Sequence, residues 1–275
     1  MSGGGAAGAR VFESALFRTT CTCLLTERQL LVVDPNWLPA EVAAVRAYAD
    51  RVGAGRERFL LFTHSDYDHI IGYGAFADFT TLASQRFVDN PARAEQLRKA
   101  REWDDEYYIR RDYPLDYPRI DRPVAGDEEE VTLGGETYRC YQAPGHNYDG
   151  LLTLHPASGT LLTGDYLCNV EFPFVYHSVA DYRTTLDKLD RLIRGGAVRT
   201  LIAGHGDPTS DRGEMERRLA DARAYLDALE AAVRSNRELD TAALFARYGF
   251  PLGHAKFHAA NVKLMRQYVH GGEKN

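Results

Sequence analysis

The sequence predicts an α/β protein in which two β-sheets pack against each other and helices cover their outer faces. Both halves of the chain contain short strand-like runs that are followed by segments with apolar residues at helical spacing. A chain organised in this way buries the apolar faces of its sheets and helices in layers. In addition, several apolar strands end in His or Asp side chains, which indicates one shared cleft.

The first half predicts a three-stranded meander, a helix and a buried strand. The dipeptide Asp34-Pro35 is a turn signal after the third strand, and Pro39 is a favourable first residue for the helix. Strands are expected at residues 10–17, 20–26, 29–34 and 58–62. Helical composition covers residues 39–52 and 84–112, and a loop follows at 113–118.

The second half predicts more strands and then a helical C-terminal part. Strands are expected near residues 129–133, 136–142, 150–155, 160–164 and 198–203, and helices near 180–194, from about 213, and over 240–270. The helix from 213 carries one apolar stripe that we expect to pack inside the protein, formed by Leu219, Ala222, Leu226, Leu229 and Val233. The predicted organisation is a flexible tail at 1–10, a main domain at 11–210 and a helical cap at 211–275.

Composition narrows the function classes. The chain has 275 residues, 44% of them hydrophobic, and a formal net charge of −6, which argues against nucleic acid as a partner. No apolar stretch nears the ~18 residues of a membrane span, and the N-terminus lacks the apolar core of a secretory signal. We therefore expect a cytoplasmic protein with a small-molecule substrate and no membrane partner, and we leave its oligomeric state open, a homodimer included. The cysteines are expected as buried thiols: Cys21, Cys23, Cys140 and Cys168.

The segment T-H-S-D-Y-D-H at residues 63–69 concentrates metal-ligating side chains directly after the buried strand. His64, Asp66 and Asp68 alternate along it, and His69 adjoins Asp68, so a bent loop could direct them to two adjacent points. Divalent metals need deprotonated oxygen or nitrogen donors that converge in this way. Taken alone, the segment also fits a solvated turn.

Three later strand ends favour the metal interpretation. His146, Asp165 and His205 each lie beside glycine at the end of an apolar strand. Glycine permits the tight turns and close backbone approach that aim a side chain into a cleft. Four such strand ends in one chain predict a metal site and not a set of surface turns.

These motifs resemble the metallo-β-lactamase superfamily, specifically its glyoxalase II-like and lactonase-like branches, over most of the chain up to G-H-G at 204–206. The family pattern is H-x-H-x-D-H, then an isolated His, a bridging Asp and a final His, and it is matched here by His64, Asp68, His69, His146, Asp165 and His205. The resemblance implies an αβ/βα four-layer sandwich of two mixed sheets, with Asp34 supporting the metal loop. We accordingly expect two ligand groups joined by a bridging Asp165: His64, Asp66 and His146 around one ion, and Asp68, His69 and His205 around the other.

Two residues depart from the family pattern. Asp66 stands where the family usually has its second histidine, and a hard carboxylate should shift the site from zinc toward iron or manganese. Flavodiiron proteins of the same superfamily carry Glu at this position and bind iron. Asp149 stands where the family usually has glycine. We expect two divalent ions, with zinc as the first candidate and iron or manganese as alternatives.

The expected activity is hydrolysis of an ester, thioester, lactone or phosphoester. Two ions about 3.5–4 Å apart can share a hydroxide nucleophile, which Asp68 would orient. The candidate substrate-binding residues are Tyr67, Tyr176, His177 and His258. Two alternatives stay open: a non-haem di-iron redox protein acting on O₂, NO or a sulfur substrate, and a non-catalytic metal-binding sensor.

Overall fold

The computed structural model describes residues 8–271 and contains two β-sheets packed face to face, as predicted. Residues 1–7 of the predicted tail lie outside the described part, and residues 8–10 belong to the first strand. The first sheet has six strands in sequence order: β1 (Gly8–Glu13), β2 (Thr20–Leu25), β3 (Gln29–Val33), β4 (Glu57–Leu61), β5 (Thr80–Ser84) and β6 (Arg122–Val124). The first three form the predicted antiparallel meander, and β3 to β6 run parallel.

The second sheet has five strands in the order β11-β10-β9-β8-β7. These are β7 (Glu129–Leu133), β8 (Glu136–Gln142), β9 (Leu151–His155), β10 (Thr160–Leu162) and β11 (Thr200–Ile202). Their pairing is antiparallel except between β10 and β11, so β8, β10 and β11 all point in one direction. Both sheets are therefore mixed, as the resemblance implied.

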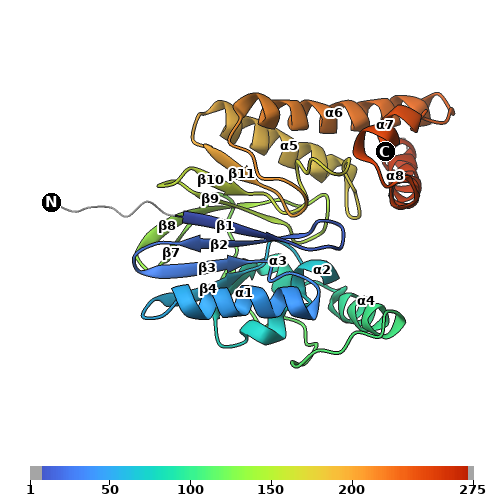
Figure 1. Ribbon diagram of the computed structural model, residues 1–275. Helices are drawn as coiled ribbons and strands as arrows, with labels where there is room; N and C mark the ends of the chain where they lie inside the picture. Colours follow the sequence, from blue (N-terminus) through green and yellow to red (C-terminus); the bar gives the residue numbers. More distant parts are fainter. Residues whose placement is uncertain (1–7, 272–275) are drawn as a thin grey trace.

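Helices cover the outer faces of both sheets (Figure 1). On the first sheet and at its end lie α1 (Pro39–Val52), α2 (Tyr67–Ile70), the 3₁₀ helix η1 (Tyr73–Phe76), α3 (Gln85–Val88) and α4 (Arg93–Glu106). On the second sheet lie α5 (Val179–Arg194) and α6 (Arg212–Arg234), followed by α7 (Ala242–Tyr248) and α8 (Pro251–Gly271). Helices α4 and α8 lie at the same end of the sandwich in Figure 1. Among residues 8–271, none of the helices combines the length and the apolar composition that a membrane crossing requires.

Side chains alternate in direction along the buried strands, so they form one inner core between the sheets and two outer cores under the helices. In β3, Leu31 and Val33 face the core between the sheets, whereas Leu30 and Val32 face the helices on the other side. The second outer core lies between the second sheet and the helices α5, α6 and α8. It includes the whole predicted stripe of α6, and all four cysteines of the chain are buried and free.

The region after residue 80 differs from the sequence expectation. Residues 84–112 were expected to be helical, but the segment starts as the end of β5 and divides into the short α3 and the longer α4. Strand β5 was missed because it is only five residues long and no turn signal separates it from the helix that follows. Strand β6 was missed because it contains Pro123, which is tolerated there because β6 is an edge strand.

Strand direction brings the predicted site residues to one edge. The parallel strands β3 and β4 end next to Asp34 and the 63–69 loop, and the codirectional strands β8, β10 and β11 lead to His146, Asp165 and His205. Backbone hydrogen bonds join the two sheets at this edge, since Leu151 N donates to Thr63 O at 2.8 Å and Thr20 N donates to Gly204 O at 2.7 Å.

Candidate metal centre

The seven predicted ligands converge on one buried point between the sheets. Three of them form what we call the first half-site, where the Asp66 Oδ2 atom lies 3.6 Å from His64 Nε2 and 3.3 Å from His146 Nε2. Three others form the second half-site, where Asp68 Oδ2 lies 3.4 Å from His69 Nε2 and 3.6 Å from His205 Nε2. In each group, the candidate ligand atoms all lie within 4.8 Å of one another.

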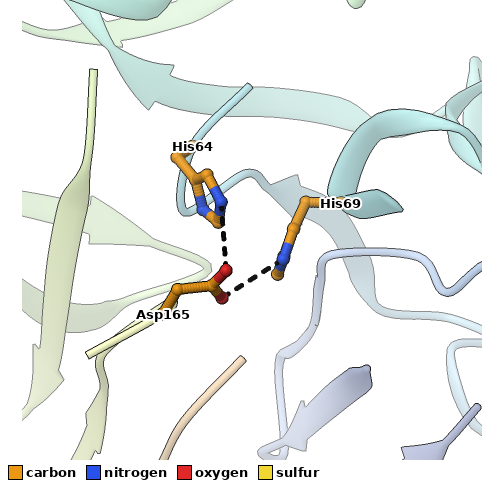
Figure 2. Close-up of side chains that lie close together, drawn as sticks. All are labelled: His64, His69 and Asp165. Carbon is orange, nitrogen blue, oxygen red and sulfur yellow. Dashed lines mark ion pairs between the residues drawn. The ribbon is translucent and has the colours of Figure 1, made fainter. Parts of the chain in front are cut away.

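Asp165 lies between the two half-sites. Figure 2 shows His64 and His69 aiming at its carboxylate, with Nε2···Oδ distances of 3.6 and 3.2 Å. Oδ2 of the same carboxylate lies 3.2 Å from the Nε2 atoms of both His146 and His205. One carboxylate therefore faces all four imidazoles, which is the position a bridging ligand needs.

The four histidines share one orientation. Each Nδ1 atom has a hydrogen-bond partner: the Thr63 hydroxyl for His64 at 3.0 Å, Asp34 Oδ2 for His69 at 2.9 Å, Phe174 O for His146 at 2.7 Å and Phe17 O for His205 at 2.9 Å. Carbonyl and carboxylate oxygens only accept, so the Nδ1 atoms facing them carry the proton. The Thr63 hydroxyl donates to Asp34 Oδ2 at 2.6 Å, so it accepts from His64 in the same way.

The Nε2 atoms of the four histidines show whether the site fits a metal. The Nε2 atoms of His64, His69 and His146, together with Asp165 Oδ1, are buried without a hydrogen-bond partner among the described residues. Leaving a buried polar atom unsatisfied costs about 1–3 kcal/mol, so this cluster is unfavourable unless something else occupies it. Four lone-pair nitrogens and several carboxylate oxygens directed at one space are the donor set of divalent cations, and the residues fit such ions.

The electrostatics of the cluster point the same way. Burial lowers the pKa of His205, but the Asp165 and Glu171 carboxylates outweigh burial and raise this pKa to about 10. The pKa values of His69 and His146 are also raised against burial, chiefly by Asp165. Burial disfavours ionised Asp66, yet the adjacent imidazoles of His146 and His64 hold its pKa well below the usual range. The site therefore attracts positive charge.

Gly204 makes room for the bridging position. A Cβ atom at this residue would lie 2.2 Å from Asp165 Oδ1 and 3.0 Å from His69 Cε1. Any side chain would push the carboxylate out of its place, which explains why the G-H-G segment starts with glycine.

Comparisons with known proteins agree with this geometry. The profile of the family described as "Metallo-beta-lactamase superfamily" matches residues 16–239, well over half of the chain. The chain belongs to the metallo-beta-lactamase superfamily. No curated protein gives a significant match to the sequence.

Several solved structures share the fold at low sequence identity. A metallo-beta-lactamase family protein from Thermus thermophilus is 23% identical, with a TM-score of 0.59 and coverage of 82% of this chain and 83% of that one. The BLEG-1 B3 metallo-beta-lactamase is 18% identical, with a TM-score of 0.58 and coverage of 76% and 97%. The sec-alkylsulfatase Pisa1 from Pseudomonas sp. is 14% identical, with a TM-score of 0.62, and the match covers 83% of this chain but only 43% of that longer one.

The residue that departs from the superfamily motif, Asp66, is fixed by two neutral amides. Its Oδ1 atom accepts hydrogen bonds from Gln96 Nε2 at 3.0 Å and from Asn147 Nδ2 at 2.9 Å. Its Oδ2 atom is the one that faces His64 and His146. The two amides thus leave a single oxygen directed at the first half-site.

Asp149, the second departure, braces the metal loop from behind. It is fully buried, and its carboxylate accepts from the Ser65 backbone N–H at 3.3 Å and from Asn90 Nδ2 at 2.8 Å. Asn90 Nδ2 also donates to the Ser65 hydroxyl at 2.8 Å. The side chain that replaces the usual glycine therefore fastens the middle of the H-S-D segment to the α3–α4 connection.

One acidic residue of the site was not anticipated. Glu171 forms a further possible ligand group with Asp165 and His205, again within 4.8 Å. Burial raises the pKa of Glu171 to about 7, with Asp165 adding to the rise and His205 opposing it. Its position six residues after the predicted bridging aspartate is the only sequence signal that could have drawn attention to it.

The four predicted substrate-binding residues differ in how near they lie to the candidate metal ligands. The Tyr176 ring lies 5.1 Å from the His146 ring and is 42% exposed, and Tyr67 lies in α2 between two candidate ligands. His177 lies at the margin, where its Nε2 atom is 3.5 Å from Asp181. His258 lies inside the helical C-terminal part, with Nδ1 3.0 Å from the Tyr225 hydroxyl, and none of the metal-ligating groups found within residues 8–271 includes it.

Proposed function

We propose that this chain is a dinuclear metal-dependent hydrolase that acts on an ester, thioester, lactone or phosphoester of a small molecule. The observation that carries the proposal is the position of Asp165, a buried carboxylate that faces an imidazole pair from each half-site at 3.2–3.6 Å. A single-metal site would need one such group, whereas two groups joined by one carboxylate suit two ions.

The two half-sites would hold the ions, with zinc as the first candidate and iron or manganese as alternatives. Bound there, a pair of divalent ions lowers the pKa of water toward about 7 and polarises a carbonyl or phosphoryl oxygen. The alternatives to zinc rest on Asp66, because a carboxylate in place of imidazole is a harder ligand and adds negative charge.

The protein side chains have distinct roles in this proposal. Asp68 is the catalytic carboxylate, because its Oδ2 atom faces the second half-site and can orient the attacking hydroxide. Tyr176 lies beside His146 with its side chain partly exposed, so its phenol can donate to the oxygen that develops negative charge. Tyr67 and His177 line the approach, and His258 acts through Tyr225 on the shape of the cap. We further propose a cytoplasmic protein without nucleic-acid or membrane partners, and we leave its oligomeric state open, a homodimer included.

The test combines metal analysis with a substrate panel. Protein purified with zinc, iron or manganese should contain about two ions per chain, and at least one loaded form should hydrolyse a member of an ester, thioester, lactone and phosphodiester panel. Chelated protein that keeps its circular dichroism spectrum is the control. Well-folded protein with no bound metal would contradict the proposal, and O₂ or NO consumption by the iron form without any hydrolysis would favour the redox alternative.

A further inference from the structure

An aromatic cluster adjoins the metal loop, and Tyr67 is its only member with a role described so far. We call it the aromatic wall, and it consists of Phe17, Trp37, Tyr67, Trp103 and Tyr107. Trp37 is fully buried at its centre, with ring-centroid distances of 5.4 Å to Phe17, 5.4 Å to Tyr67 and 5.0 Å to Trp103. Tyr107 lies 4.3 Å from Trp103. The outer members are open to solvent, since Phe17 is 45% exposed and Tyr107 53%.

The wall is tied directly to the candidate ligands. Tyr67 stands between Asp66 and Asp68 in the chain, and the Phe17 carbonyl accepts the Nδ1 hydrogen bond of His205 at 2.9 Å. The wall is therefore joined to candidate ligands of both half-sites, to Asp66 in the first and to Asp68 and His205 in the second.

Phe17 is held in a strained backbone conformation. It has φ 51° and the next residue, Arg18, has φ 54°, so the turn between β1 and β2 uses the left-handed region twice without glycine. For a bulky residue this is a true outlier, and such strain clusters at functional sites. The turn is held by the G-H-G segment, because Gly206 N donates to Arg18 O at 2.9 Å. A strained turn thus presents an exposed aromatic ring beside the metal centre.

Two arginines next to the wall are already paired. Arg111 forms a buried ion pair with Asp104 at 2.7 Å and donates to Trp37 O at 2.7 Å, which fixes the end of α4 against the wall. Arg18 pairs with Glu13 and Asp207 at 2.8 and 2.7 Å. Neither of these guanidinium groups is therefore free to bind an anionic group on this surface.

From these observations we infer that the aromatic wall is the subsite for an aromatic ring of the substrate, so that the chain acts on esters or thioesters of aryl-substituted acids or alcohols. This inference rests on the proposed hydrolysis for its substrate class. The two exposed rings offer roughly 200 Å² together, far below the ~800 Å² that each side of a stable protein interface buries. A small ring fits this area, whereas a second protein does not.

The chain offers a direct assay, because both of its tryptophans, Trp37 and Trp103, belong to the wall. Phenylacetate, titrated into metal-loaded protein, should change the intrinsic fluorescence saturably and bind roughly tenfold more tightly than acetate. Phe17→Ala should remove most of the difference in affinity between phenylacetate and acetate. Phe250→Ala is the matched control, because Phe250 is also an exposed phenylalanine with φ 50° but lies in the C-terminal cap.

Each outcome decides one point. Equal affinity for phenylacetate and acetate, or an equal loss in both variants, would overturn the aromatic subsite. So would a Phe17-dependent dimer in sedimentation experiments whose formation excludes phenylacetate. The titration needs no turnover, so selective phenylacetate binding by a protein that hydrolyses nothing would refute the proposed hydrolysis and leave the subsite standing. Hydrolysis of phenylacetyl and acetyl thioesters at equal kcat/KM would refute the aromatic subsite and leave the proposed hydrolysis standing.

Discussion

The two half-sites direct similar atoms at the candidate metal centre, but different residues support their histidines on the opposite side of each ring. In the second half-site, His69 donates its Nδ1 proton directly to the buried carboxylate of Asp34. In the first half-site, His64 reaches the same carboxylate only through the Thr63 hydroxyl. The remaining two histidines are equivalent in this respect, because each rests on a backbone carbonyl.

The supporting residues should also affect how tightly each half-site binds a metal ion. A carboxylate behind an imidazole raises its basicity and fixes its orientation, so the second half-site should hold its ion more tightly. In the first half-site, two neutral amides hold one oxygen of Asp66 and leave the other free. The comparison teaches that one buried carboxylate, Asp34, can make two half-sites unequal without changing the number of metal-facing groups.

The largest effect is expected where the half-sites meet. Asp165→Ala should lose both ions and at least about 10³-fold in turnover, because metal catalysis supplies several kcal/mol of transition-state stabilisation. Elemental analysis and turnover should be measured on the same preparation, with circular dichroism to establish folding. A variant that kept one ion in the second half-site would show that the two sites are held independently.

Much of this centre could be predicted from the sequence because its ligands follow strand ends. An apolar strand predicts where its last side chains go, and parallel strands bring those ends to one edge, so the sequence predicts that the 63–69 loop meets His146, Asp165 and His205, and the structure brings them together. The two-sheet architecture follows from the same buried runs.

The supporting residues could not be predicted in this way. Gln96 and Asn147 meet Asp66 across 30 and 81 positions of sequence, and nothing in their local pattern distinguishes them from ordinary polar residues. The contact of Gln96 depends on where α4 packs. Helical composition over residues 84–112 predicts a helix at Gln96, but it does not predict which loop that helix packs against.

A smaller effect is expected from a substitution of Asp34, the residue that makes the two half-sites unequal. Asp34→Asn keeps the size of the side chain and tolerates the observed φ of 48°, but it removes the charge and one acceptor. Loss of such a supporting carboxylate typically costs about 10–100-fold in metal affinity, and the second half-site should lose more than the first. Competitive chelator titrations resolve the two binding steps.

The matched control is Thr63→Val, which removes only the hydroxyl that links His64 to Asp34. It should weaken the first half-site by less than the Asp34 variant weakens the second. Equal losses at both steps in Asp34→Asn would mean that the carboxylate stabilises the loop as a whole and does not distinguish the half-sites.

The smallest effect concerns which metal is chosen at the first half-site. Asp66→His replaces a hard, charged oxygen with a neutral nitrogen, so the ratio of zinc to iron plus manganese should rise by roughly threefold in cells grown in one medium. The new imidazole would point its Nδ1 proton at the amides of Gln96 and Asn147, which now donate to the carboxylate. The Gln96 Oε1 atom has no partner among the described residues, so this amide can turn and accept the proton, and stability should change by only about 1 kcal/mol. Asp66→Asn separates charge from ligand type, because it removes the charge without adding an imidazole. If neither variant changed the metal ratio, Asp66 would orient its neighbours and not bind the ion.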